Sequence, residues 1–188
     1  MLSLWVDKNP IYDGHQLQPL HNYLNHGLLG DSIVSWVGAC DVNFDHMLDG
    51  EDLRVLSPIQ ADKMLHFVLE IFDQSLHAGV FLQRLMGEIM RETLRELGDS
   101  QQIDSLRRQG DDLYLKDGKL NVSIATCCNR SFLIHFGVNV SNGGTPVKTA
   151  ALCDFGITDI PSFAKRYMEK VTSEVESQIR ATQKVKIF

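Results

Sequence analysis

Segments with the two-residue period of β-strands and segments with the 3.6-residue period of α-helices follow one another along the chain. Apolar residues alternate with polar ones near the start, and β-branched or aromatic runs recur further on. The predicted strands lie at 2–6, 32–37, 66–72 and 130–140. Apolar residues at helical spacing predict helices over 15–28, 74–97 and 159–180. Strands mixed with helices, together with consecutive hairpins, indicate an α+β fold with a mainly antiparallel sheet.

Residues 110–126 have the form of a two-residue hairpin with Asp117-Gly118 as its turn. That register places Lys116 opposite Lys119 and Leu115 opposite Leu120, because facing residues share one side of a sheet. One face is then apolar, with Leu113, Leu115, Leu120, Val122 and Ile124. The other carries Asp112, Tyr114, Lys116, Lys119, Asn121 and Ser123, and the next strand adds Ser131, His135 and Asn139. This polar face is either a solvated sheet surface or a site for an anionic or carbonyl ligand.

Residues 38–63 form the least regular stretch, which is acidic and long enough to be a functional loop. Within it, four side chains offer oxygen and imidazole ligands to a divalent cation: His46, Asp49, Glu51 and Asp52. A solvated acidic loop explains the same residues. We therefore predict no metal site here.

Composition narrows the function classes. The chain has 188 residues, a length that favours one domain over 1–188. Its net charge of −6 gives no positive field to attract nucleic acid. No run approaches the roughly 18 apolar residues of a membrane span. The cysteines, Cys40, Cys127, Cys128 and Cys153, show no zinc-type spacing. We therefore expect a cytoplasmic protein in a reducing compartment, bound neither to membrane nor to nucleic acid.

The segment GDDLYLKDGKLNVSIAT resembles the central motif of biotin protein ligases, in which Trp-Pro-Asn-Asp-Leu-Tyr precedes a Lys-Leu-Ala-Gly strand. The family's lysine contacts the acid and phosphate of an acyl-adenylate, and its match is Lys119. HFGVNV and LCDFGI are similar to the strand and segment that follow in those ligases. As a whole, the chain resembles domain-of-unknown-function family 366 of archaea and bacteria. The resemblance implies a biotin/lipoate ligase-like (class II synthetase-like) fold, with a mixed, mainly antiparallel sheet backed by helices.

The chain departs from the ligase pattern at the Gly-Arg-Gly-Arg-Arg-Gly loop, which holds adenylate in that family. GACDVNFDHMLDGEDLR stands in its place, with Arg54 as its one arginine. An acidic loop repels phosphate unless a cation intervenes. The absence of the arginine-rich loop therefore weakens the expectation that ATP is a cofactor. The chain also resembles lipoyl-type octanoyltransferases, in which a lysine strand and a histidine strand precede a nucleophilic cysteine. Cys153 falls at a similar spacing after Asn139.

The resemblance therefore implies binding of a carboxylic acid or acyl donor, followed by its activation or transfer, possible homodimers and an acceptor protein. A non-catalytic binding or interaction module is the alternative. The predicted catalytic residues are Lys119 and Cys153, and the predicted ligand-binding residues are Arg54, Asp112, Asn121, Ser123, His135 and Asn139. His66 and Glu70 share one strand face, where they either line the same site or satisfy each other.

Overall fold

A five-stranded mixed sheet forms the centre of the computed structural model, which describes residues 1–186. Its strands, in spatial order, are β1 (Leu2–Trp5), β2 (Ser32–Val42), β3 (Ile59–Phe72), β8 (Ser131–Asn139) and β7 (Asn121–Cys127). Only β1 pairs in parallel, with β2, and the other neighbours are antiparallel. Every residue of β8 is buried, because the strand lies inside the sheet with protein on both faces. The α+β fold with a mainly antiparallel sheet is confirmed.

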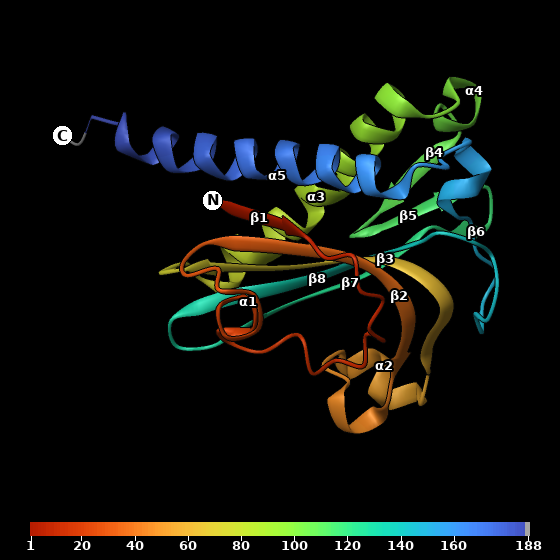
Figure 1. Cartoon of the computed structure of the whole chain (residues 1–188), viewed down its shortest axis with the longest axis horizontal. Coiled ribbons are helices and arrows are strands. Elements are labelled where there is room, and N and C mark those ends of the chain that lie inside the picture. The colour runs from red at the N-terminus through yellow and green to blue at the C-terminus, as the bar shows by residue number, and fades with distance from the viewer. Residues whose placement is uncertain (187–188) are drawn as a thin grey trace.

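One face of this sheet is covered by α3 (Leu76–Leu97) and α5 (Ile160–Gln183), as Figure 1 shows. The apolar stripe of each helix packs on the sheet and on the other helix, and the Tyr167 hydroxyl donates to the carbonyl of Met86 over 3.0 Å. Asp159 caps α5, as its position before Pro161 favours. The cap of α3 is Ser75, two residues after Asp73, which instead adopts a positive φ.

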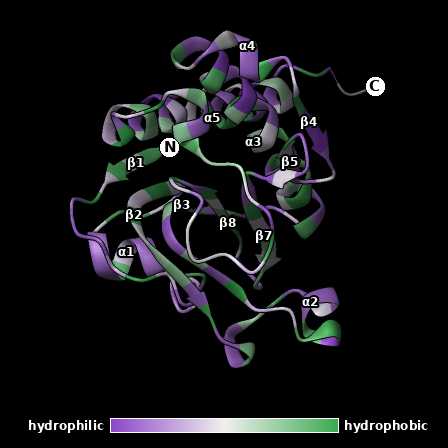
Figure 2. Cartoon of the chain, turned by 90° about the vertical axis from the view of Figure 1, so that its right-hand side faces the viewer, coloured by the Kyte–Doolittle hydropathy of each residue, from purple (hydrophilic) through white to green (hydrophobic). Residues whose placement is uncertain are grey.

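The opposite face is covered by irregular chain and three short helical segments, which stand apart from α3 and α5 in Figure 2. These segments are α1 (His21–His26), η1 (Phe44–His46) and α2 (Gly50–Val55). The predicted helix over 15–28 is wrong except for α1. Pro19 disfavours helical backbone at the residue before it, and Leu20 has a φ of 62° at the start of α1.

The predicted loop over 38–63 is shorter than expected. β2 continues to Val42 and β3 begins at Ile59, so the two strands form a long arm and the irregular part is 43–58. Below, residues 43–58, with η1 and α2, are called the excursion. It packs over the second apolar cluster of the protein, which includes Tyr12, Val42 and Met47.

A smaller three-stranded sheet contains β4 (Leu106–Gln109), β5 (Asp112–Leu115) and β6 (Gly118–Lys119), after the short helix α4 (Ser100–Ile103). The predicted hairpin turn is wrong by one residue and its pairing by two, because Tyr114 faces Lys119 and Leu115 faces Gly118. Lys116 and Asp117 are therefore the turn residues, with a φ of 56° at Lys116.

The register error has a physical cause. Gly118 is required elsewhere, since a Cβ on it would lie 2.7 Å from the carbonyl carbon of Thr149. After β6 the chain leaves the small sheet and joins the large one as β7. The predicted apolar face is consequently divided: Leu113 and Leu120 lie in the main core, whereas Val122 and Ile124 pack against the second cluster. The η2 turn (Leu152–Phe155) then leads into α5.

Within residues 1–186, no helix combines the length and the apolar character that crossing a membrane demands.

Candidate functional site

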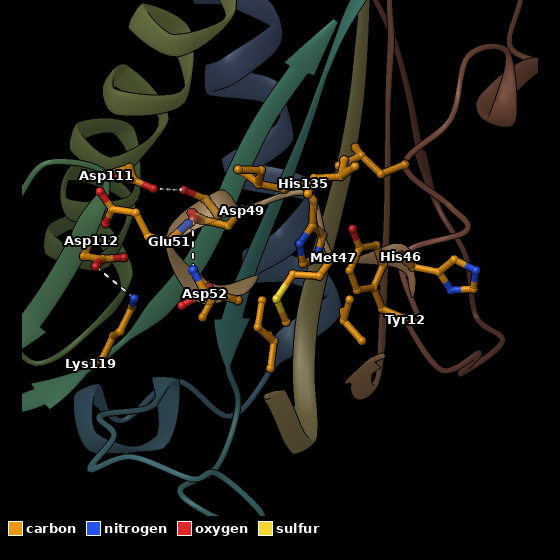
Figure 3. A pocket seen from close by; sticks show the side chains of 18 residues that line it. Tyr12, His46, Met47, Asp49, Glu51, Asp52, Asp111, Asp112, Lys119 and His135 are labelled. Carbon is orange, nitrogen blue, oxygen red and sulfur yellow. Dashed lines mark hydrogen bonds and ion pairs between the residues drawn. The ribbon is translucent and has the colours of Figure 1, made fainter. Parts of the chain in front are cut away.

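Two adjoining cavities lie beside the sheet, and the more enclosed of them, of about 270 Å³ and partly open to solvent, is called the closed cavity below. It lies between the sheet and the excursion, and its walls come from residues 12–17, the end of β2, the start of β3, β6, β7, β8, the excursion, Asp111 and the first residue of β5. The apolar part of the lining consists of Leu17, Val42, Met47, Leu48, Ile59, Val122 and Ile124. Figure 3 shows that the polar lining falls into two groups, with carboxylates and Lys119 on one side and Tyr12 and His135 on the other.

The neutral end of the cavity is built from Tyr12 and two histidines of adjacent strands. The Tyr12 ring stacks on the His135 ring, with centroids 3.6 Å apart and planes 9° from parallel. Nδ1 of His66 lies 3.1 Å from Nε2 of His135, and Nε2 of His66 lies 3.3 Å from the carbonyl oxygen of Gly38. Burial lowers the pKa of His66 to about 4 and lowers that of His135 well below its ordinary value. Both imidazoles are therefore neutral at pH 7.

The charged end is built around an ion pair. Nζ of Lys119 lies 2.9 Å from Oδ2 of Asp112, and both side chains are more than two-thirds buried. Burial alone would lower the pKa of Lys119, but hydrogen bonding and attraction to Asp112 outweigh it and raise this pKa. Burial also raises the pKa of Asp112, although Lys119 opposes that shift. Lys119 is therefore a fixed cation, and neither a base nor a free nucleophile at neutral pH.

Five carboxylates and one lysine line the cavity at this end: Asp49, Glu51, Asp52, Asp111, Asp112 and Lys119. Asp49 caps α2 by accepting the backbone N–H groups of Glu51 and Asp52. Burial raises the pKa of Asp52, and the nearby Asp49 raises it further. The lining is thus electronegative, and Lys119 is the one lysine or arginine in it.

A second, more open cavity of about 390 Å³ adjoins the first. The two share Asp52, Ile59, Lys119 and Val122. The remaining lining of the open cavity includes Asn139 and the loop residues 145–149. Lys119 therefore stands where the two cavities meet.

The structure brings together four of the predicted site residues. Lys119, Asp112, Ser123 and His135 line the closed cavity, and Asn139 lines the open one. The Asn139 amide also donates to the backbone carbonyls of Lys119 (3.0 Å) and Ala150 (3.1 Å), so it holds the strand that carries the lysine.

The remaining predicted residues lie elsewhere. Asn121 is fully buried and bridges two backbone groups, accepting from Leu113 N–H and donating to the Asp111 carbonyl. It faces Val138 on the helix-covered side of the sheet, not the side of His135 on which it was predicted. Arg54 and Cys153 are exposed, and neither lines either cavity.

The pattern of residues missed two contributors. Tyr12 lies outside every predicted strand and helix, and the pairing of its backbone with β2 brings it onto His135. Asp111 accepts from Ser123 Oγ (2.8 Å) and Gln83 Nε2 (2.9 Å), which fixes it at the cavity wall. The closeness of His66 and His135 could have been predicted, because they lie on neighbouring strands at positions whose side chains share a face of the sheet.

Two other candidates from the sequence, the His66–Glu70 pair and a metal site, do not form within residues 1–186. The carboxylate of Glu70 accepts the hydroxyl of Ser131 at 2.7 Å and the N–H of Leu20, and it does not pair with His66. Over the described part of the chain, no three His, Cys, Asp or Glu side chains are grouped in a way that could hold a metal ion.

Comparison with known proteins places this geometry in a family. The family model "Domain of unknown function (DUF366)" matches residues 1–186. The chain belongs to this family. It is 34% identical over 182 residues to the uncharacterized protein MJ0805 of Methanocaldococcus jannaschii, with 94% of the chain and 80% of that protein covered. A solved protein of unknown function from Pyrococcus horikoshi superposes with a TM-score of 0.91 at 32% identity, over 100% of both chains.

More distant solved structures share the fold of this DUF366 protein. Biotin protein ligase from Aquifex aeolicus, solved in complex with biotin and ATP, matches with a TM-score of 0.58 at 10% identity. The match covers 93% of this chain and 70% of that one. Lipoate protein ligases have the same fold. The biotin/lipoate ligase-like fold implied by the sequence is therefore confirmed, whereas likeness at this identity carries no activity with it.

Proposed function

We propose that this DUF366 protein binds a small carboxylic acid, or an acyl derivative of one, and activates or transfers its carboxyl group. The observation that carries the proposal is the position of Lys119 at the junction of two adjoining cavities. Such a junction suits a two-substrate reaction, with the acid in one cavity and the activating or accepting partner in the other. The volume of the closed cavity suits a small ligand.

The chemical role of Lys119 follows from its charge. A half-buried cation held by Asp112 can stabilise negative charge that develops on a carbonyl or acyl-phosphate oxygen, and it does so without reorganising during the step. Asp112 orients the ammonium group, and the bond from Asn139 to the Lys119 carbonyl supports the strand behind it. Lys119 is thus the proposed catalytic residue, and Asp112 and Asn139 are positioning residues.

Adenylation by ATP is one version of this activation, and the solved ligase with biotin and ATP supports it by analogy of fold. The open cavity is lined by two lysines, Lys119 and Lys148, in place of an arginine-rich loop. That donor set matches a triphosphate poorly, because its carboxylates Asp52 and Asp117 oppose the same charge. An acyl donor with little charge fits this lining better than a free nucleotide.

Two alternatives remain distinct from this proposal. A cysteine-based acyltransferase would need Cys153 near the bound acyl group, and its exposed position on η2 disfavours that route. One observation favours a non-catalytic binding module: the lining of the closed cavity is electronegative, and it holds no second lysine or arginine that could stabilise a reacting phosphate. We place the protein in the reducing cytoplasm because its cysteines are free, and propose a carrier protein as acceptor.

The test combines ATP–pyrophosphate exchange, acyl transfer from thioesters and thermal-shift screening over a panel of small carboxylic acids. We expect at least one acid or acyl donor to stabilise the protein and to react, and Lys119→Ala to abolish the reaction. Lys165→Ala, which removes an exposed lysine of α5, is the matched control and leaves both readouts unchanged. Stabilisation without any reaction would favour the binding module. Reaction that survives in Lys119→Ala would reject the proposed role of the lysine.

A further inference from the structure

Two hydrogen bonds link Gly38, His66 and His135, and the Gly38 carbonyl determines which atom donates in each. The carbonyl oxygen of Gly38 can only accept, so Nε2 of His66, 3.3 Å away, carries a proton. His66 is fully buried and neutral, and its Nδ1 is therefore an acceptor. Nε2 of His135, 3.1 Å from that Nδ1, must then be the donor. In a neutral His135 this assignment leaves Nδ1 as a bare acceptor.

That bare acceptor belongs to the closed cavity. His135 is 3% exposed and lines the cavity, and among residues 1–186 its Nδ1 has no hydrogen-bond partner. The hydroxyl of Tyr12, also 3% exposed and on the same lining, has no partner within this range either. Figure 3 shows the two side chains together at the end of the cavity away from Lys119. Neither atom is among the fully enclosed side-chain atoms that lack a partner, so both open on the cavity. Polar atoms in such a place are ordinarily satisfied by water or by a ligand, which suits the site to a polar guest.

We propose that the ligand carries an N–H or O–H donor at the end that enters the cavity first, and that this donor bonds to Nδ1 of His135 beside the Tyr12 hydroxyl. Its opposite end is the carboxyl or acyl group, a part of the inference that rests on the proposed function. The substrate class is then a small carboxylic acid with a terminal hydroxyl, amide or ring N–H, and simple alkyl acids are excluded. His66 acts as a positioning residue, because it sets which nitrogen of His135 is the acceptor.

Discrimination follows from the cost of an unmet acceptor. Water can satisfy Nδ1 of His135 in the free protein, and a ligand without a donor would displace that water and offer nothing in return. A site built around a ligand hydroxyl or N–H therefore rejects the analogue that lacks it. The stacked Tyr12 ring adds a flat apolar wall, which favours a planar group behind the donor.

The binding test uses matched pairs of probes on the full chain, measured by calorimetry and thermal shift. One pair is 6-hydroxyhexanoic and heptanoic acid, and another is 3-(4-hydroxyphenyl)propanoic and 3-(4-methylphenyl)propanoic acid. We expect the donor-bearing member of a pair to bind roughly 10- to 100-fold more tightly. His135→Leu removes this preference, Tyr12→Phe reduces it while keeping the ring stack, and Tyr23→Phe is the control at an exposed tyrosine. Equal affinity within both pairs would overturn the inference.

Methyl esters of the same probes, which lack both the charge and any added donor, separate this inference from the proposed function. A donor preference among the esters, with no binding of the acids, would support the His135 site and reject the carboxyl role of Lys119. No binding by any probe would overturn both. Nitrogen-15 NMR of the imidazoles gives a readout that needs no ligand and no variant: we expect His135 to be unprotonated at Nδ1. A proton found at Nδ1 would overturn the inference directly.

Discussion

The α-carbon of Gly118 lies so close to the backbone of Thr149 that an added Cβ would come within 2.7 Å of its carbonyl carbon and oxygen. The two segments are joined beside this contact, because Lys119 N–H donates to the Lys148 carbonyl and Ala150 N–H donates to the Lys119 carbonyl, each at 3.0 Å. Backbone bonds on both sides therefore fix the strand on which the Lys119 side chain stands.

The hairpin turn gives the first prediction, in which two substitutions have opposite signs. Gly118→Ala forces backbone apart from backbone and should lower the free energy of unfolding by about 2 kcal/mol or more. Lys116→Gly relieves a positive φ at an exposed position and should raise it by about 0.5–1 kcal/mol. Urea denaturation measures both. Equal tolerance of the two changes would contradict the observed register.

The ion pair gives the second prediction. Lys119→Met leaves Asp112 half-buried without its cation, which should cost about 1–2 kcal/mol of stability, between the values for exposed and buried pairs. Asp112→Asn in the same chain should recover part of this loss, because it removes the orphaned charge. A double-mutant cycle from denaturation curves measures the coupling. Strictly additive effects would show that the pair contributes nothing.

The histidine pair gives the third prediction, in the dependence of stability on pH. The pKa of His66 is about 4 in the folded protein and about 6.5 in the unfolded chain. Between these values the unfolded chain binds the proton and the folded protein does not, so stability falls as pH decreases from 6.5 to 4. The His66 contribution amounts to roughly 3 kcal/mol over this window.

His66→Phe removes that contribution from the protein. His135, whose pKa burial also lowers, acts in the same direction as His66 in both proteins. Asp112 and Asp52, whose pKa values are raised, act in the opposite direction in both. Denaturation of the two proteins at pH 7, 6, 5 and 4 gives the difference in slope. We expect the variant, although less stable at pH 7, to lose less stability on acidification. Parallel curves would mean that His66 is not buried as a neutral base.

The exposed cysteine gives the fourth prediction. Cys153→Ser should leave ligand binding and any acyl transfer within twofold of the unchanged protein, because Cys153 lines neither cavity. Mass spectrometry after incubation with an acyl-thioester should show no adduct that depends on this residue. A Cys153-linked acyl group would restore the octanoyltransferase-like route and remove Lys119 from the centre of the mechanism.

Local patterns predicted the parts of this fold that depend on local interactions. The apolar alternation of β8 and the Asp159–Pro161 start of α5 were sufficient to place both elements. The hairpin was predicted in the wrong register, because the choice between Gly118 as a turn residue and Gly118 as a close contact is made by Thr149, which is distant in the chain. The helix over 15–28 was wrong because its leucine spacing concealed the break at Pro19.

The candidate site was predictable where it depends on the alternation of side chains between the two faces of a strand. Lys119 and His135 were expected on one ligand site, and they line one cavity. Asn121 was misplaced because the chain changes sheets between β6 and β7, where its pairing with Val138 puts it on the other face from His135. Arg54 was expected from the resemblance alone and lies outside the cavity. Tyr12 could not be found in advance, because its contribution arises from stacking across the sheet and leaves no local signature.

The two ends of the closed cavity differ in how freely they can change over evolutionary time. His66 and His135 belong to β3 and β8, whose side chains pack into the core, so replacements there endanger folding itself. Asp49, Glu51 and Asp52 belong to the excursion, where α2 has no buried residue. Descendants of this protein can therefore acquire a new chemistry at the charged end of the cavity by mutation of a surface segment. The proposed requirement for a ligand donor at the neutral end is inherited with the fold.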